Sequence, residues 1–526
     1  MATPNSSGFW LLLAATVALV LFLGVVFMGF GAGANPSTED PIQEHANTDN
    51  TDHSDNPEGG FKPDPMKCKE WPVPTAALIL TGEQHGYIEP CGCTENQSGG
   101  VSRRGDLVRQ LHELGWKTAG LDLGGLVKRN RLQSQRKFET MLAALKDLNY
   151  KAVAFGAEDV KLGPDYLLSQ NLPDNPISFL NANVTFYDTP DLGTPNRTRV
   201  FEHGGLKFGV TSVMGDSLRL EIKQVEDVKF QPPADVLPAA LESLEAEQVD
   251  LKILLAQGSL EEGRRLARDF PAFDLVLTAG GPEDPNGTPE AIGNTVLLTV
   301  GHKGKHAGVL AIYPDGDPKF RFELVQLDRT RFGDTPKMIE HMRYYQDQLK
   351  QQQIAVQESP VGHPSGATFV GSDACADCHE EEYAIWKKTG HAEAFASLDP
   401  KNERHGHERL KGIARMFDPE CLACHVTGWN PQEVFRYRSG FINAEFAADE
   451  EERTMSPLLI GSGCENCHGP GSRHIELADN GEDELAVKEV RLTLDQANSA
   501  EGCYKCHDLD NSPTFDFDEY WEKIAH

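Results

Sequence analysis

The chain has 526 residues, of which 39% are hydrophobic and 25% charged, and its formal net charge is −31. This length predicts two or three domains of roughly 100–200 residues each. So acidic a surface disfavours nucleic acid and anionic lipid as partners. It is typical of a protein with basic docking partners, or simply of a well-solvated exported protein.

Residues 1–34 contain an uncharged apolar run from Phe9 to Ala32. A membrane-spanning helix needs about 20 apolar residues, whereas the core of a signal peptide has about 7–15, so we expect a retained transmembrane anchor. The sequence Ala32-Gly33-Ala34 is also an acceptable cleavage site, and cleavage after Ala34 would release the protein from the membrane. Residues 35–70 are rich in Asn, Asp, Pro and Thr, which predicts a disordered acidic linker.

Between residues 71 and 330, short apolar runs alternate with stretches that have apolar residues at helical spacing. This alternation predicts a layered α/β domain. The expected strands are 76–81, 118–123, 152–155, 207–213, 251–255, 273–278 and 295–299, with helices over 105–114 and 135–148. Residues 331–366 are expected to form a polar connecting helix, over 336–356, and then a hinge rich in Pro and Gly.

The last region, residues 367–526, contains the pentapeptide Cys-x-x-Cys-His four times. The two thiols of such a motif can form thioethers to the vinyl groups of haem, and the adjacent His then binds the iron as proximal ligand. Four copies predict four covalently attached haem c groups. The segments between them are short, so we expect a mostly helical, loop-rich domain. The expected attachment residues are Cys375, Cys378, Cys421, Cys424, Cys464, Cys467, Cys503 and Cys506, and the proximal ligands are His379, His425, His468 and His507.

Haem attachment to these motifs takes place outside the energy-transducing membrane, so everything after the anchor is expected in the periplasm. Three cysteines, Cys68, Cys91 and Cys93, remain in a compartment where disulfides persist. Their odd number requires at least one to be free, metal-bound or paired with another chain. The Cys91-Gly92-Cys93 sequence is compatible with a disulfide to Cys68, a redox pair or a soft-metal site.

Five further histidines of this region are candidates for the sixth iron ligand. A continuous helix over 380–395 would place His391 about 18 Å from His379, so His391 is expected to reach a different haem. His474 follows His468 through a short Gly-Pro-Gly turn, and His526 ends the chain. We expect these three, His391, His474 and His526, as distal ligands, and regard His405 and His407 as weaker candidates.

Three stretches of this region resemble the cytochrome c554 family of tetrahaem cytochromes. They begin with the first motif, the third motif and Phe515, and they end at His391, His474 and His526. The resemblance implies that these histidines are distal ligands and that the second haem, on His425, is five-coordinate. We expect His474 on the haem of His379, His391 on that of His468, and His526 on that of His507.

The α/β region resembles the 5′-nucleotidase-like metallophosphoesterases at Gly82-Glu83-Gln84-His85-Gly86 and Gly99-Gly100-Val101-Ser102-Arg103-Arg104. Such enzymes need a carboxylate that bridges two metal ions. That position is Gly125 here, and the later motifs read Gly156-Ala157-Glu158-Asp159, Ala256-Gln257 and Gly280-Gly281-Pro282-Glu283. The departures predict that metal-dependent hydrolysis has been lost.

Together these features predict a membrane-anchored, periplasmic tetrahaem c-type cytochrome that transfers electrons to or from redox partner proteins. The degenerate phosphoesterase-like domain would serve in docking or ligand binding. Two alternatives stay open: a haem enzyme acting on a small nitrogen compound at the haem of His425, and a metal-dependent nucleotidase or phosphoesterase with appended haems.

Overall fold

The computed structural model describes residues 65–90, 97–172, 175–190, 192–402 and 410–526. The expected membrane anchor, most of the acidic linker, Cys91, Cys93, His405 and His407 lie outside these ranges. Within them, no helix combines the length and the apolar composition that crossing a bilayer requires.

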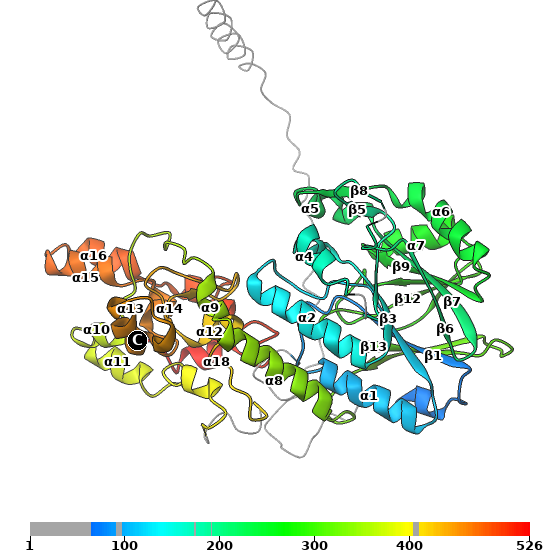
Figure 1. Ribbon diagram of the computed structural model, residues 1–526. Coiled ribbons are helices and arrows are strands. Elements are labelled where there is room, and N and C mark those ends of the chain that lie inside the picture. The colour runs from blue at the N-terminus through cyan, green and yellow to red at the C-terminus, as the bar shows by residue number, and fades with distance from the viewer. Residues whose placement is uncertain (1–64, 91–96, 173–174, 191, 403–409) are drawn as a thin grey trace, which may run out of the picture. The chain divides into compact units, whose positions relative to one another are not determined.

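The α/β domain is built on two six-stranded sheets (Figure 1). Each sheet has a parallel centre and antiparallel strands at its edge. In spatial order the first sheet contains β14 (Phe320–Gln326), β13 (His306–Ile312), β1 (Ala76–Thr81), β2 (Thr118–Asp122), β3 (Tyr150–Ala154) and β4 (Ser178–Leu180). The second contains β11 (Glu290–Ile292), β12 (Thr295–Thr299), β10 (Leu275–Thr278), β9 (Leu251–Gln257), β7 (Leu206–Met214) and β6 (Thr198–His203), and β5 (Val184–Phe186) pairs separately with β8 (Val228–Phe230).

The two sheets pack face to face, and helices cover their outer faces (Figure 1). Alternate residues of one strand point to opposite faces, so in β1 Leu78 belongs to the core between the sheets while Ile79 packs under the helices of the first sheet. This gives four layers, helix–sheet–sheet–helix. The first sheet is covered by α1 (Val101–Glu113), α2 (Leu132–Asp147) and α8 (Pro336–Gln351), and the second by α6 (Pro233–Ala246) and α7 (Leu260–Asp269).

The remaining elements of this domain are short. They are η1 (Lys67–Glu70), α3 (Ala157–Val160), α4 (Pro164–Ser169), η2 (Asp216–Leu218) and α5 (Arg219–Ile222). Met66 and Cys68, which flank the start of η1, are buried, so the folded region begins before residue 71, earlier than the sequence indicates. Cys68 is a free thiol in this structure rather than half of a disulfide.

The expected connecting helix is divided into α8 and α9 (Ile354–Gln357) at Gln353, whose φ of 52° lies in the left-handed region. The C-terminal region beyond it is mainly short helices and loops, as expected. Its elements are α10 (Ser372–Ala376), α11 (Glu380–Trp386), η3 (Phe395–Leu398), α12 (Pro419–His425), β15 (Trp429–Asn430), β16 (Phe435–Arg436), η4 (Ala444–Phe446), α13 (Glu450–Met455), η5 (Ser456–Leu459), α14 (Cys464–His468), α15 (Ser472–Asp479), α16 (Asp483–Val490), α17 (Leu494–Ala497), η6 (Cys503–Lys505) and α18 (Phe517–Trp521).

Candidate functional site

Each of the four Cys-x-x-Cys-His motifs lies on or beside a short helical turn. In the first and fourth motifs the backbone N–H of the histidine donates to the carbonyl of the first cysteine, at 2.9 Å in His379 and 3.0 Å in His507. Residues i, i+3 and i+4 of such a turn lie on one side of the backbone. Every motif therefore presents two sulfurs and an imidazole together, as attachment of haem c requires.

Three pairs of imidazoles face each other at one separation. The ring centres are 6.2 Å apart for His379 and His474, and 5.8 Å apart for both His391–His507 and His468–His526. Two imidazoles on opposite sides of one metal ion have centres about 6 Å apart, from metal–nitrogen bonds of roughly 2 Å plus the two ring radii. The residues present therefore fit three haems with two axial histidines each.

The pairing differs from the expected one in two cases. His474 lies opposite His379 as expected, but His391 faces His507, and His526 faces His468. The helix expected over 380–395 also ends early, because α11 stops at Trp386. Sequence spacing alone cannot show which of two candidate histidines pairs with a given motif histidine. The turns between the short helices determine which two imidazole rings face each other.

Most of these rings have their Nδ1 atom engaged by a nearby oxygen. The Nδ1 of His468 lies 2.8 Å from the carbonyl of Val490, and that of His474 lies 2.9 Å from the carbonyl of Ala486. The Nδ1 of His507 lies 2.9 Å from the Ser512 hydroxyl, and that of His526 lies 2.9 Å from the carbonyl of Ile524, two residues earlier. A carbonyl partner fixes the tautomer, so Nε2 is left with its lone pair for a metal.

The Nδ1 of His425, on α12, also has nearby oxygen partners. Its Nδ1 lies 2.7 Å from the carbonyl of Ala394 and 3.3 Å from the hydroxyl of Ser397. Among the described residues, however, no second imidazole faces His425 as the three paired rings face each other. A five-coordinate haem on His425 stays a prediction, because His405 and His407 lie outside the described residues.

The motifs are also grouped in twos through their sulfurs. The thiol of Cys375 neighbours that of Cys464, and the thiol of Cys424 neighbours that of Cys506. The first motif thus lies beside the third, and the second beside the fourth. Haem groups attached at neighbouring motifs would lie close to each other.

A buried carboxylate joins the first and third motifs. Glu465, in the third motif, accepts hydrogen bonds from the backbone N–H groups of Gly371 at 2.8 Å, Val370 at 2.9 Å and Gly471 at 2.7 Å. Burial raises the pKa of this carboxyl, although these three donors oppose the rise. No signal in the sequence pointed to this role, because nothing marks which variable position of a haem motif points into the protein.

The α/β domain holds the helix that carries the second motif. Asp418 caps α12, accepting from the backbone N–H of Glu420, and its two oxygens also accept from the side chains of Gln133 on α2 and Gln346 on α8, both at 2.6 Å. Glu420 lies 2.5 Å from Lys137 and 3.2 Å from Arg129. The sequence Asp418-Pro419-Glu420 is a recognisable helix start, so the cap was predictable while its partners were not.

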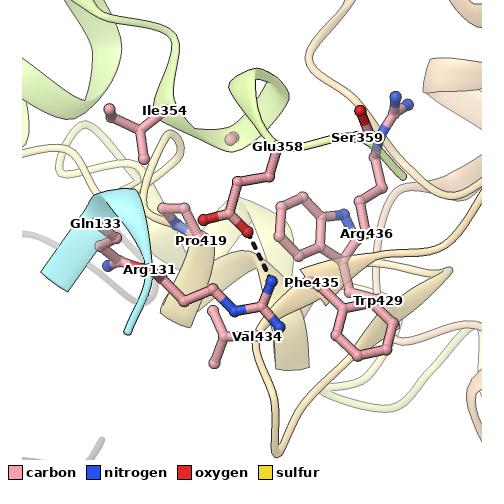
Figure 2. A pocket seen from close by; sticks show the side chains of 11 residues that line it. Arg131, Gln133, Ile354, Glu358, Ser359, Pro419, Trp429, Val434, Phe435 and Arg436 are labelled. Carbon is pink, nitrogen blue, oxygen red and sulfur yellow. Dashed lines mark hydrogen bonds and ion pairs between the residues drawn. The ribbon is translucent and has the colours of Figure 1, made fainter. Parts of the chain in front are cut away.

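A small cavity lies where α2, α9 and α12 meet (Figure 2). Arg131 extends across it to Glu358, at 2.7 Å, and its guanidinium lies over the Phe435 ring at 5.6 Å. The cavity is therefore lined by an ion pair and an aromatic ring that connect the two regions.

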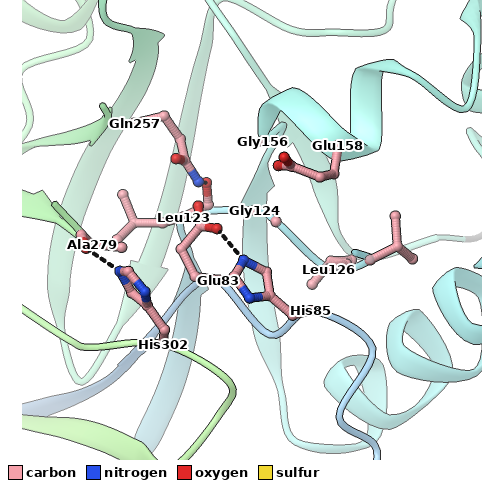
Figure 3. Close-up of polar contacts among 12 residues, drawn as sticks. Glu83, His85, Leu123, Gly124, Leu126, Gly156, Glu158, Gln257, Ala279 and His302 are labelled. Atoms are coloured by element: carbon pink, nitrogen blue, oxygen red, sulfur yellow. Dashed lines mark hydrogen bonds and ion pairs between the residues drawn. The ribbon is translucent and has the colours of Figure 1, made fainter. Parts of the chain in front are cut away.

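The residues that replace the phosphoesterase metal ligands surround Glu83 (Figure 3). His85 donates to Glu83 at 2.7 Å, and His302 lies close by with its Nε2 2.7 Å from the carbonyl of Ala279. Burial alone would raise the pKa of Glu83, but the hydrogen bond and charge of His85 lower it. We refer to Glu83, His85, Gly125, Glu158 and Gln257 as the former metal centre.

Two buried carboxylates near this centre, Asp122 and Asp159, are engaged by hydrogen bonds from the surrounding protein. Asp122 accepts from Thr81, from Gln84 and from the N–H of Gly124. Asp159 accepts from the N–H groups of Gly125, Leu126 and Gly156. Across the described residues, no three His, Cys, Asp or Glu side chains converge as a metal ion needs.

The C-terminal region combines four Cys-x-x-Cys-His motifs with three facing pairs of imidazoles, as a c-type cytochrome domain would. Residues 374–469 match the family described as cytochrome c554 and c-prime. A segment of 108 residues is 32% identical to cytochrome c-554 of Nitrosomonas europaea, covering 20% of this chain and 40% of that protein. The C-terminal region therefore contains a segment that matches the cytochrome c554 family, and the chain spans less than half of that relative's length.

The α/β domain is similar to solved 5′-nucleotidase-like structures. A 5′-nucleotidase precursor of Thermus thermophilus has 19% sequence identity, with 55% of this chain and 61% of that chain covered and a TM-score of 0.46. A sulfate thiohydrolase of the same organism has 15% identity, with 55% and 63% covered and a TM-score of 0.45.

Proposed function

We propose that this protein is a membrane-tethered, periplasmic tetrahaem c-type cytochrome that transfers electrons. The observation that carries the proposal is the set of three imidazole pairs with ring centres 5.8–6.2 Å apart, each including one motif histidine. Iron held by two imidazoles has no vacant position, so such haems exchange electrons without binding substrate.

The chain's own residues prepare the imidazoles for this role. Carbonyl oxygens at Nδ1 make the opposite nitrogen of His468, His474 and His526 a stronger donor to iron. A stronger donor favours the oxidised state and lowers the reduction potential. The proposed haem groups would be attached through the eight motif cysteines, and the adjacency of Cys375 to Cys464 and of Cys424 to Cys506 supports transfer within each pair.

The membrane tether and the periplasmic location are the parts of this proposal that rest on the sequence. The apolar run from Phe9 to Ala32 would hold the protein at the membrane, and cleavage after Ala34 would release it into the periplasm. Attachment of haem c to the motifs takes place in the same compartment. Redox partner proteins with basic surfaces would suit the net charge of −31.

The first experiment counts the haems of the mature protein. Mass spectrometry of the denatured full-length chain is expected to show the polypeptide plus four haem masses. The double variant Cys503→Ala/Cys506→Ala is expected to lose one of the four. As a control, Cys68→Ala removes a free thiol outside the motifs and should retain all four. A protein that carries no haem would contradict the proposal.

A second candidate function is catalysis at the haem of His425. The observation in its favour is that, within the described part of the chain, no imidazole faces His425. An iron open on one side can bind a small molecule such as nitrite, hydroxylamine or nitric oxide. Adding each compound to the reduced protein tests this: a Soret change in one haem of four, accompanied by turnover, would favour an enzyme. A Soret change without turnover would favour a relay.

Metal-dependent hydrolysis is the function that the former metal centre supports least. Gly125 supplies no bridging carboxylate, and Asp122 and Asp159 are saturated by hydrogen bonds. Nucleotides incubated with the protein and manganese or zinc should not be hydrolysed. Activity that disappears in His85→Ala would overturn this conclusion.

A further inference from the structure

The turn that follows the fourth motif holds the proximal imidazole of that motif. The Ser512 hydroxyl lies 2.9 Å from the Nδ1 of His507. The backbone N–H of Ser512 donates to the carbonyl of Asp508 at 2.7 Å, and that of Asn511 to the Asp508 carboxylate at 2.7 Å. The shape of the turn 508–512 therefore fixes where the Ser512 hydroxyl meets the ring.

The tip of this turn is bound by the α/β domain. Asp510 receives the Lys303 ammonium at 2.7 Å on one carboxylate oxygen and the Tyr87 hydroxyl at 2.8 Å on the other. Gln97 donates to the carbonyl of Leu509 at 3.3 Å and to that of Asp510. The side chains of Lys303 and Asp510 are only 20% and 14% exposed, so these charge-assisted hydrogen bonds are largely shielded from water.

The two loops whose side chains bind the Asp510 carboxylate border the former metal centre. Tyr87 lies in the turn after β1 that also carries Glu83 and His85. Lys303 directly follows His302, which lies beside Glu83 and His85 (Figure 3). The two loops are joined to each other, because the N–H of Lys303 donates to the carbonyl of Glu83 at 2.6 Å. Glu83, His85 and Lys303 all have φ between 46° and 58°, a conformation that non-glycine residues adopt only when their surroundings impose it.

We propose that these loops act as a clamp on Asp510 that positions His507, through the turn 508–512, and so sets the orientation and reduction potential of the fourth haem. Lys303 and Tyr87 are positioning residues here, since neither reaches the imidazole itself. The inference rests on the proposed attachment of haem at Cys503 and Cys506. It gives the degenerate domain a role in tuning one particular redox centre.

The physical reason is that the donor at an axial imidazole controls both its plane and its basicity, and these tune the potential of the iron. Releasing Asp510 frees the turn, and the Ser512 hydroxyl then no longer has a fixed place at Nδ1. Removing the Lys303 charge alone would also stabilise oxidised iron and lower the potential. Tyr87→Phe removes one hydrogen bond to Asp510 without changing any charge. It therefore tests the effect of positioning separately from the effect of charge.

The test uses the full-length protein with its haems and compares Lys303→Met, Tyr87→Phe and Ser512→Ala. Lys305→Met is the matched control: it lies in the same loop and pairs with Glu283, not with Asp510. Spectroelectrochemical titration and electron paramagnetic resonance are expected to show one of four potentials, and the g values of one low-spin haem, shifted in the three variants. If Ser512→Ala shifts the same haem, that haem is the fourth, because Ser512 contacts His507. Lys305→Met should leave all four potentials and all g values unchanged.

Four unchanged potentials and g values in Tyr87→Phe and Lys303→Met, with full haem content, would overturn the inference and leave the proposed function intact. Equal shifts in Lys303→Met and Lys305→Met, with none in Tyr87→Phe, would reduce the effect to loop charge and also overturn it. A wild-type protein without haem would instead overturn the proposed function.

Discussion

The ammonium group of Lys137, on α2 of the α/β domain, lies 2.5 Å from the carboxylate of Glu420 in the first turn of α12. That helix carries the second haem motif and ends at His425. Arg129 binds the same carboxylate at 3.2 Å, and the neighbouring Asp418 is held by Gln133 and Gln346. Charged and amide side chains of the α/β domain thus hold the helix that carries the second motif.

The contact between Lys137 and Glu420 should make this junction sensitive to acid. Burial by itself would raise the pKa of Glu420, but Lys137 and Arg129 outweigh it and lower that pKa below its ordinary 4.5. A carboxyl with a lowered folded-state pKa contributes stability that is complete above its unfolded pKa and is lost as the pH falls through the folded value. The stabilisation is therefore complete at neutral pH and should be lost progressively as the pH falls below the unfolded pKa of about 4.3 and then through the lower folded value.

Lys137→Met is expected to lower the free energy of unfolding by about 1 kcal/mol at pH 7, a modest value because Glu420 is 36% exposed. Thermal unfolding of the haem-loaded protein between pH 3 and 7 measures this. The difference from wild type should shrink towards acid. Lys337→Met, at a side chain that is 58% exposed, is the control and should have little effect at any pH. A difference that grows in acid would contradict the assignment.

Glu465 should be essential to the packing of the first and third motifs. Replacing it with Ala leaves the N–H groups of Val370, Gly371 and Gly471 without their acceptor. Each unsatisfied buried donor costs about 1–3 kcal/mol, so we expect a loss of about 3 kcal/mol once the site relaxes. Denaturant unfolding monitored at the Soret band measures this. Glu450→Ala, at a side chain that is 79% exposed, serves as the control and should be nearly neutral.

The distal assignments predict a spin count. Oxidised wild-type protein should show three low-spin irons and one high-spin iron by electron paramagnetic resonance, because three imidazole pairs are complete. His474→Ala removes one partner of His379 and should give two low-spin and two high-spin irons. His363→Ala alters a histidine that packs against Phe369 and Tyr437 and should leave the count unchanged. Four low-spin irons in the wild type would show that His425 also has a partner.

Restoring the bridging carboxylate alone should harm the former metal centre. Gly125 has φ +69°, and a Cβ there would lie 2.7 Å from a Glu83 carboxylate oxygen. Gly125→Asp is therefore expected to lower stability by about 1–3 kcal/mol, and to restore no hydrolysis of nucleotides with manganese. Gly293→Asp is the matched control: its φ is +60°, but no atom lies within 4 Å of the added Cβ, so it should cost less. Equal losses would show that only backbone strain matters.

The haem motifs, the α/β fold class and the candidate distal ligands could be predicted from the sequence alone. A haem motif is local, because its two sulfurs and its imidazole occupy one helical turn. The eight cysteines and four histidines of the motifs could therefore be proposed as haem-binding residues from the sequence alone. The alternation of apolar runs indicated the α/β class, and the absence of side-chain ligands at Gly125 and Ala157 was visible directly. The candidate distal ligands His391, His474 and His526 were also visible, since few other histidines lie in that region.

Only the tertiary structure decided which of these histidines faces which. Partners such as His391 and His507, or His468 and His526, are far apart in sequence, and the turns and short helices between them determine their meeting. The same holds for Lys303 with Asp510 and for Lys137 with Glu420, which join residues more than 200 positions apart. Residues that act within one helical turn can be identified from the sequence, because they are neighbours along the chain. Pairing between distant residues depends on how the whole chain packs, and sequence spacing does not specify that packing.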